Sequence, residues 1–281
     1  MIPATLLDDI IDRALAEDVS GGDITSLATV SATGRAVGRA LAKTPLVVAG
    51  GDVFARVFYR VDPGVRVERL VAEGTAAAAG DALWAVEGAT QSLLMAERTA
   101  LNFAQRLSGI ASLTAEYVKR VPAGASLRIT DTRKTTPGLR VLERAAVRAG
   151  GGKNHRNDLG AAILIKDNHI AAAGGVGEAL RRARAGAPHP SRLEIEIETL
   201  AALDEALENG ADIVLLDNFE PGEVAEAVQR ARGKALVEVS GGVTLHRIEA
   251  LARAGVDIVS VGALTHSAPA ADISFEIEPL S

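Results

Sequence analysis

The second half of the chain repeats one pattern, a short apolar run followed by a helical segment, and this repeat limits the folds open to it. Strands that alternate with helices of this length predict parallel pairing. Several of the helical segments end at glycine, as helices with a C-terminal cap do. Six consecutive units favour closure into an α/β barrel. The runs are SLRITD (126–131), AAILIKD (161–167), LEIEIE (193–198), DIVLLD (212–217), ALVEVS (235–240) and DIVSVG (257–262).

A doubly wound sheet is the competing architecture for such a repeat. It would be expected to carry a GxGxxG fingerprint after an early strand, and the sequence has none. The first half of the chain differs from the second. Strands are predicted there at 37–42, 45–49, 65–71 and 81–86, with turns of Gly, Pro and Asp between them and helices at 6–16, 51–61 and 91–107.

These patterns predict two domains. Residues 1–107 form an N-terminal α+β domain in this prediction, and residues 108–267 form the α/β barrel that is expected to carry catalysis. The C-terminal segment 268–281 follows the barrel, and its return to pack on the first domain is compatible with this prediction.

Composition excludes several classes of protein. The chain has no cysteine, which excludes disulfides and thiolate chemistry, and its acidic amphipathic N-terminus does not resemble a signal peptide. No apolar run approaches the roughly 20 residues of a membrane helix. A net charge of −6 and 3% aromatic residues do not suit nucleic-acid binding. A cytoplasmic protein without nucleic-acid or membrane partners is expected.

Positive charge is concentrated in one segment of this acidic chain. Residues 131–156 contain seven Lys or Arg against two acids, a formal +5. Cations also flank the apolar run 159–165, which is predicted to be a buried strand. The concentration predicts a site for a small polyanion. The flanking residues are Lys153, His155, Arg156, Lys166 and His169.

Polar residues follow each predicted barrel strand, where catalytic groups of such barrels lie. Glu194, Glu196 and Glu198 alternate with aliphatic residues, so they share one face of a strand. Carboxylates at Glu196 and Asp217 predict a divalent cation. Glycine-rich loops after the last two strands predict contacts to a phosphate. The loop residues are Ser240, Gly241, Gly242, Gly262 and Ala263.

Simpler explanations exist for some of these residues. Arginines 140, 144 and 148 recur at helical spacing, which is typical of a solvated or interface face. Any one of the three glutamates could form an ion pair at the barrel rim, and Asp217 could cap a helix. For Lys134, Arg156 and Lys166 the simple explanation is weaker, because cations beside barrel strands are costly without an anion.

One long stretch carries a resemblance to a known family. DTRKTTPGLRVLERAAVRAGGGKNHRNDLGAAILIKDNHI resembles the central motif of the quinolinate phosphoribosyltransferases, the carboxylating nicotinate-nucleotide pyrophosphorylases. The resemblance extends over nearly the full chain, in order and in approximate spacing. The other matching segments are EDVSGGDITS (17–26), AERTALNFAQRLSGIA (96–111), EIEIETL (194–200), DIVLLDNF (212–219), VEVSGGV (237–243) and GVDIVSVGALTHSAPAADISFEI (255–277).

The resemblance implies a fold and a reaction. The fold is that of the type II phosphoribosyltransferases, an N-terminal α+β sandwich and an open, seven-stranded α/β barrel, paired as a homodimer. The reaction converts quinolinate and phosphoribosyl pyrophosphate (PRPP), with magnesium, into nicotinate mononucleotide, pyrophosphate and carbon dioxide, a step of NAD biosynthesis.

The resemblance also implies roles for individual residues. Arg133, His155 and Arg156 would hold the two quinolinate carboxylates, joined by Arg98 from the neighbouring subunit. Lys134 and Lys166 would lie between quinolinate and the departing pyrophosphate. Glu196 and Asp217 would contact the ribose hydroxyls and magnesium, with Glu194 and Glu198 as the alternatives to Glu196. The 5-phosphate would be received by Ser240, Gly241, Gly242, Gly262 and Ala263.

Three other functions stay open at the level of the sequence. The first is a related phosphoribosyltransferase with another acceptor, such as nicotinate, or the barrel protein of molybdate operons. The second is a Schiff-base aldolase that uses Lys166, since a lysine at a strand end can form an imine. The third is a catalytically silent protein that binds phosphometabolites. Two carboxylates need more cations than one, so the KNHR and KDNH segments favour quinolinate.

Overall fold

The computed structural model describes residues 2–280, and they divide into two compact units. The first unit contains the residues up to Ala115, then Thr135–Gly151, and the residues from Leu264 onward. The second unit contains Glu116–Lys134 and Gly152–Ala263. The domain limits that the sequence suggests, at 107/108 and 267/268, stay a prediction.

The first unit is built on an antiparallel sheet in the order β12-β1-β5-β3. Its central strands, β1 (Arg35–Ala42) and β5 (Ala82–Ala89), alternate buried and more exposed residues, which is the pattern of a sheet covered on one face. β3 (Arg66–Arg69) pairs with β5, and β12 (Ile273–Pro279) pairs with β1. The short strands β2 (Leu46–Val47) and β4 (Ala76–Ala77) form a separate pair.

Helices of the first unit cover an aromatic core. Phe54, on α3 (Gly51–Val61), stacks on Trp84 at 4.6 Å between ring centroids, and Phe58 lies 6.1 Å from Phe275 of β12. Burial of such large side chains is a main source of stability. The helix predicted at 91–107 is longer in the structure. The other helices are α1 (Ala4–Val19), α2 (Ile24–Thr29), α4 (Thr90–Lys119, which continues into the second unit), α5 (Arg140–Ala149) and α11 (Ala263–His266).

The second unit is a parallel sheet in the order β6-β11-β10-β9-β8-β7. Its two edge strands, β6 and β7, are not paired with each other in the described residues, so the barrel is open. The strands are β6 (Arg128–Thr130), β7 (Ile163–Ile165), β8 (Leu193–Ile197), β9 (Ile213–Asp217), β10 (Leu236–Ser240) and β11 (Ile258–Ser260).

The seventh strand that the resemblance implies is reduced to one bridge. Lys153 pairs in parallel with Thr130 of β6, and its N–H donates to the carbonyl of Ile129 at 2.8 Å. Glycines at 150–152 come directly before Lys153, and glycine disfavours an extended strand.

The predicted strand at 159–165 is also shorter than expected. Only Ile163–Ile165 is extended, and Leu159 is 71% exposed, so the prediction of a buried strand from Leu159 onward was wrong. A turn competes with the strand here. The N–H of Gly160 donates to Asp158 Oδ1 at 2.9 Å.

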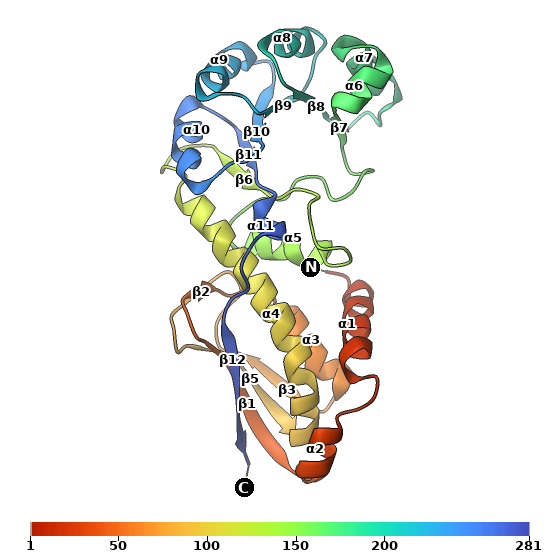
Figure 1. Ribbon diagram of the computed structural model, residues 1–281, viewed down its shortest axis with the longest axis vertical. Helices are drawn as coiled ribbons and strands as arrows, with labels where there is room; N and C mark the ends of the chain where they lie inside the picture. Colours follow the sequence, from red (N-terminus) through yellow and green to blue (C-terminus); the bar gives the residue numbers. More distant parts are fainter. Residues whose placement is uncertain (1, 281) are drawn as a thin grey trace. The chain divides into compact units, whose positions relative to one another are not determined.

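Helices follow the barrel strands and cover one face of them (Figure 1). The strand residues whose side chains face these helices are aliphatic and buried, for example Ile195, Val214 and Val239. No helix in residues 2–280 has the length and hydropathy needed to cross a membrane. The helices after β7 to β10 are α6 (Asp167–Ala173), α7 (Val176–Gly186), α8 (Leu200–Glu208), α9 (Pro221–Ala231), the 3₁₀ turn η1 (Leu245–Arg247) and α10 (Ile248–Ala254).

Candidate active site

The register of the strands collects polar residues on the face away from the helices. Partners in parallel strands point to the same side, and β8, β9 and β10 pair Glu196 with Leu215 and Leu215 with Glu238. One step toward the carboxyl ends, Asp217 pairs with Ser240. The even-numbered residues of β8 and β10 and the odd-numbered residues of β9 therefore face the inside of the barrel, and several of them are charged.

Lys166, Glu196 and Asp217 form one charged group at the carboxyl ends of β7, β8 and β9. Lys166 Nζ forms an ion pair with Glu196 Oε2, and the Glu196 side chain is only 14% exposed. Burial raises the pKa of Asp217, and Glu196 adds to this effect, while Lys166 and Lys134 oppose it. Glu196, Lys166 and Lys134 are therefore each close enough to influence Asp217.

Gly241 lets the ends of β9 and β10 approach. It has a φ of +84°, and a Cβ at this position would lie 2.9 Å from Asp217 Oδ1. Asn218, the only non-glycine in the described residues with a positive φ, at 57°, donates to Asp217 Oδ2 at 3.0 Å. Asparagine tolerates this conformation better than most residues. Gly241 and Asn218 together orient the Asp217 carboxylate.

Two arginines lie close together beside this group. Burial lowers the pKa of Arg156, the charge of Arg133 lowers it further, and Glu194 has the opposite effect. The Arg156 guanidinium also donates to the carbonyl of Ala162 at 3.1 Å. Two guanidiniums that influence each other, one of them partly buried, favour an anion between or beside them.

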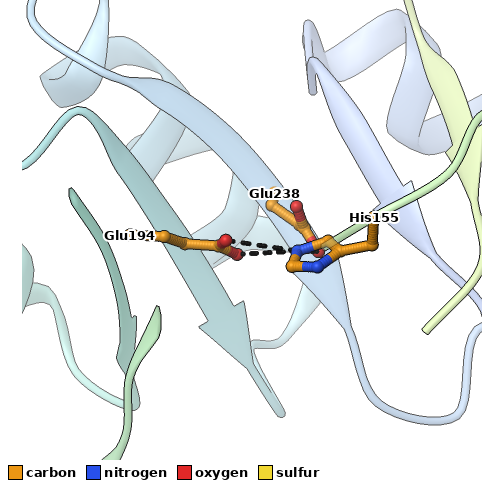
Figure 2. A group of neighbouring side chains, drawn as sticks. All are labelled: His155, Glu194 and Glu238. Atoms are coloured by element: carbon orange, nitrogen blue, oxygen red, sulfur yellow. Dashed lines mark hydrogen bonds and ion pairs between the residues drawn. The ribbon is translucent and has the colours of Figure 1, made fainter. Parts of the chain in front are cut away.

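His155 is held by two buried carboxylates (Figure 2). Its Nε2 lies 3.2 Å from Glu194 Oε2 and 3.5 Å from Glu238 Oε1, and the three side chains are 14%, 5% and 1% exposed. Burial of the ring lowers its pKa, but the adjacent carboxylates of Glu194 and Glu238 outweigh this and raise the pKa of His155 to about 10. Burial also raises the pKa of Glu194. The two carboxylates therefore favour the protonated form of the ring.

Asp131 fixes the backbone of the same segment. Its carboxylate is fully buried after β6, where Oδ1 accepts the N–H of His155 at 2.8 Å and Oδ2 accepts the side-chain amide of Asn154 at 2.5 Å. Buried hydrogen bonds to a charged group are among the stronger ones in proteins. The KNHR segment is thus attached to the barrel although it forms no strand of its own.

The structure brings together most residues that the sequence suggested. Lys134, Lys166, Glu196 and Asp217 converge at the carboxyl ends of the strands, beside Arg133, His155 and Arg156. Of the three glutamates, Glu196 pairs with Lys166, Glu194 pairs with His155, and Glu198 is exposed beyond the end of β8. Gly242, Gly262 and Ala263 follow β10 and β11. Arg98 lies on α4 in the first unit with its side chain 59% exposed.

Two further polar residues were not singled out as site residues from the sequence. Glu238 alternates with Val237 and Val239 in β10, as Glu194 and Glu196 alternate with aliphatic residues in β8. That shared alternation was the signal that could have found it. Asp131 ends the run SLRITD, and its hydrogen bonds to residues 154 and 155 depend on the bridge at Lys153, which the sequence does not reveal.

The fold and the site are those of an α/β-barrel enzyme with a site for anionic small molecules. Comparisons with known proteins are more specific. The model of the quinolinate phosphoribosyl transferase N-terminal domain matches residues 23–108, and that of the C-terminal domain matches residues 110–276. The chain belongs to the quinolinate phosphoribosyl transferase family.

Individual relatives match over nearly their whole length. The nicotinate-nucleotide pyrophosphorylase [carboxylating] of Mycobacterium leprae is 45% identical over 96% of each chain. The human protein of the same name is 37% identical over 99% of this chain and 93% of its own. The crystal structure of NadC from Streptococcus pyogenes is 41% identical, with a TM-score of 0.96 over 100% of this chain and 99% of that one.

Proposed function

We propose that this protein transfers the phosphoribosyl group of PRPP to the nitrogen of quinolinate and removes the 2-carboxylate. The products are nicotinate mononucleotide, pyrophosphate and carbon dioxide. One observation carries the proposal: two sets of charged side chains lie at the mouth of one barrel. The set of lysines and carboxylates suits an activated sugar phosphate, and its members are Lys134, Lys166, Glu196 and Asp217. The set of histidine and arginines suits an acceptor with two carboxylates, and its members are Arg133, His155 and Arg156. The carboxylating pyrophosphorylase names of the relatives support the same reaction.

The acceptor would be held by cations. Arg133 and Arg156 suit carboxylates because a guanidinium donates two parallel hydrogen bonds to them. His155 adds a third positive charge. Arg98, from the neighbouring subunit of a homodimer, would complete the set. The exposure of Arg98 on α4 is compatible with this role. Nicotinate has only one carboxylate, so a related enzyme that uses it as acceptor would need fewer cations.

The donor would lie along the strand ends. Lys134 and Lys166 would neutralise the pyrophosphate as it leaves the ribose, and the carboxylates of Glu196 and Asp217 would accept hydrogen bonds from the ribose hydroxyls. The 5-phosphate would be bound at the loops after β10 and β11. Backbone N–H groups of glycine-rich loops can approach phosphate oxygens closely. The loop residues are Ser240, Gly241, Gly242, Gly262 and Ala263.

Magnesium fits the donor side of the site. Glu196 raises the pKa of Asp217, so the two carboxylates are near enough to favour a shared cation, and carboxylate oxygens are the ligands that Mg²⁺ prefers. Glu196 and Asp217 would hold the ion. When bound, it would supply positive charge to the pyrophosphate oxygens.

The chemistry requires positioning more than a nucleophilic residue. As pyrophosphate leaves, the ribose gains oxocarbenium character, so the enzyme must neutralise the leaving group and align the pyridine nitrogen. Decarboxylation should follow transfer, because the N-glycosylated ring nitrogen is cationic and stabilises the negative charge left on the adjacent carbon. Release of free nicotinate as an intermediate would contradict this order.

The direct test is quinolinate-dependent release of both carbon dioxide and pyrophosphate from PRPP. Lys134→Ala and Arg98→Ala should each be inactive. When the two inactive variants are mixed, some activity should return if Arg98 serves a neighbouring site, because one mixed site then has both residues. Equal turnover of nicotinate and quinolinate would favour the alternative acceptor.

A cytoplasmic location stays a prediction from the sequence.

A further inference from the structure

Glu238 has no task in the proposed chemistry, yet it lies in the middle of the barrel. Its side chain is 1% exposed on β10. Within residues 2–280, Glu238 Oε1 has no hydrogen-bond partner, and the imidazole Nε2 of His155 lies 3.5 Å from it. A buried carboxylate without a hydrogen bond is costly unless a nearby charge compensates it. His155 is therefore the group with which Glu238 is placed to interact.

Three strands determine the position of His155. Asp131, after β6, accepts its backbone N–H, while Glu194 of β8 and Glu238 of β10 approach the same ring nitrogen from two sides (Figure 2). The two glutamates flank β9, and Leu215 fills the register position between Glu196 and Glu238. Nε2 is thus directed to the two carboxylates, and the ring contributes positive charge to the site.

We propose that Glu238, acting with Glu194, is a positioning residue that keeps His155 in one orientation and in its charged form, ready to receive the acidic acceptor. This inference rests on the proposed function, since the acceptor is the dicarboxylate of that reaction. Glu238 itself touches His155 and no substrate in this account.

The charged groups around the ring support this account. Glu194 and Glu238 face it from β8 and β10, Asp131 holds its backbone from the end of β6, and Arg156 follows it in the chain. The two glutamates raise the pKa of His155 to about 10, although burial acts in the opposite direction. Without Glu238, one of the two groups that favour the proton is lost, and the ring loses one of its two fixed contacts.

A metal ion is the competing occupant of the cluster. The three residues offer ligand atoms within 4.8 Å of one another. A metal on Nε2 would need that nitrogen without its proton, whereas the positioning role needs the proton on it. The two ideas therefore predict different states of the same atom.

The first experiment observes the ring in the full-length protein without substrate. In ¹⁵N-histidine spectra recorded from pH 5.5 to 9, the His155 signals, assigned with His155→Gln, should remain those of an imidazolium throughout. In Glu238→Gln they should titrate near neutral pH. Titration of His155 near 6.5 in the wild-type protein would overturn the proposal. The proposal would also be overturned if the wild-type protein contained an equimolar bound metal and the Glu238→Gln variant did not.

The second experiment measures turnover. Glu238→Gln should raise the KM for quinolinate roughly tenfold, with the kcat and the KM for PRPP changed less than about twofold, and the loss should grow as pH rises from 6 to 8.5. In the His155→Gln background the same change should add little. Glu208→Gln, an exposed glutamate at the end of α8, is the matched control and should leave all constants unchanged.

The two experiments separate the possible failures. If the wild-type protein turns over no quinolinate, the proposed function fails, while the spectra still report whether Glu238 keeps the ring charged. If turnover is normal and Glu238→Gln has wild-type constants at every pH, the positioning role fails alone. If Glu238→Gln does not fold, the wild-type spectra decide the question by themselves.

Discussion

Lys166, directly after β7, forms an ion pair with Glu196 of the neighbouring strand β8. The register explains this contact. Leu164 pairs with Glu194, so the residues two positions further along each strand, Lys166 and Glu196, face the same side. The Lys166 side chain is 45% exposed and that of Glu196 is 14% exposed. The glutamate therefore holds an amine that remains accessible at the barrel mouth.

Replacement of Lys166 should affect catalysis much more than folding. A lysine that neutralises a leaving group acts mainly in the transition state, so Lys166→Ala should lower kcat about 100-fold or more. A half-exposed ion pair contributes at most about 1 kcal/mol to stability. Steady-state kinetics and thermal unfolding of the same preparation test both statements. A large fall in the melting temperature with normal kcat would contradict them.

Gly241 and Gly242 provide a matched pair for the donor side of the site. Both have a positive φ, +84° and +55°, so alanine is strained at either position by roughly 1 kcal/mol. Only at Gly241 would the new Cβ meet Asp217 and Asn218, at 2.9 and 3.2 Å, whereas nothing lies within 4 Å at Gly242. Gly241→Ala should therefore raise the KM for PRPP about tenfold more than Gly242→Ala, in a steady-state assay.

Equal effects of the two substitutions would show that backbone strain, and not displacement of the Asp217 carboxylate, determines the loss. The Asp217→Asn variant supplies a reference for that displacement. If the geometry of Asp217 is what Gly241 protects, Gly241→Ala and Asp217→Asn should both shift the magnesium concentration that gives half-maximal rate to higher values.

The barrel could be predicted from the sequence because its strands are locally encoded. Runs such as DIVLLD and ALVEVS carry β-branched residues between helical segments, and the structure places β9 and β10 within them. The alternation in LEIEIE also predicted the shared face of Glu194 and Glu196. These two predictions from local pattern were confirmed.

Other features depend on contacts between distant residues, which a single sequence does not display. The role proposed for Glu238 requires that the loop residue His155 lies close to both Glu194 and Glu238. These glutamates are 39 and 83 positions further along the chain. The strand predicted from Leu159 was wrong because the turn at Asp158 competes with it. Arg98 is predicted to serve a second subunit, which no periodicity within the chain can indicate.

Removal of one partner of a buried ion pair should destabilise the first unit strongly. Glu143 on α5 is fully buried and accepts hydrogen bonds from Arg106 at 2.9 Å and from Thr136 Oγ1 at 2.7 Å. Arg106 also donates to the carbonyl groups of Thr265 and Ala268. Glu143→Gln leaves the guanidinium without its counter-charge, so the free energy of unfolding should fall by about 3 kcal/mol.

The comparison for this prediction is Glu87→Gln, which removes the exposed partner of Arg35. Those side chains are 41% and 54% exposed, and the cost should stay below about 1 kcal/mol. The only tryptophan, Trp84, belongs to the first unit, so urea unfolding followed by its fluorescence reports on the correct part of the chain. Similar costs for the two variants would argue against a special role for Glu143.

The stability of the second unit should depend on pH through His155. In the folded protein the pKa of His155 is raised from 6.5 to about 10, so the folded state binds this proton more tightly than the unfolded chain does. The resulting stabilisation is complete below pH 6.5 and is lost progressively as pH rises toward 10. Its upper limit is about 5 kcal/mol, and a realised change of about 2 kcal/mol between pH 6.5 and 9 would be readily measured.

Urea unfolding followed by far-UV circular dichroism at pH 6.5, 8 and 9 tests this dependence, because Trp84 fluorescence reports on the first unit. His155→Gln should be less stable than the wild-type protein at pH 6.5, and the difference should shrink as pH rises. Glu238→Gln should behave in the same way, since it removes one of the two carboxylates that retain the proton. A constant difference between wild type and His155→Gln at all three pH values would mean that packing of the ring, and not its charge, stabilises the barrel.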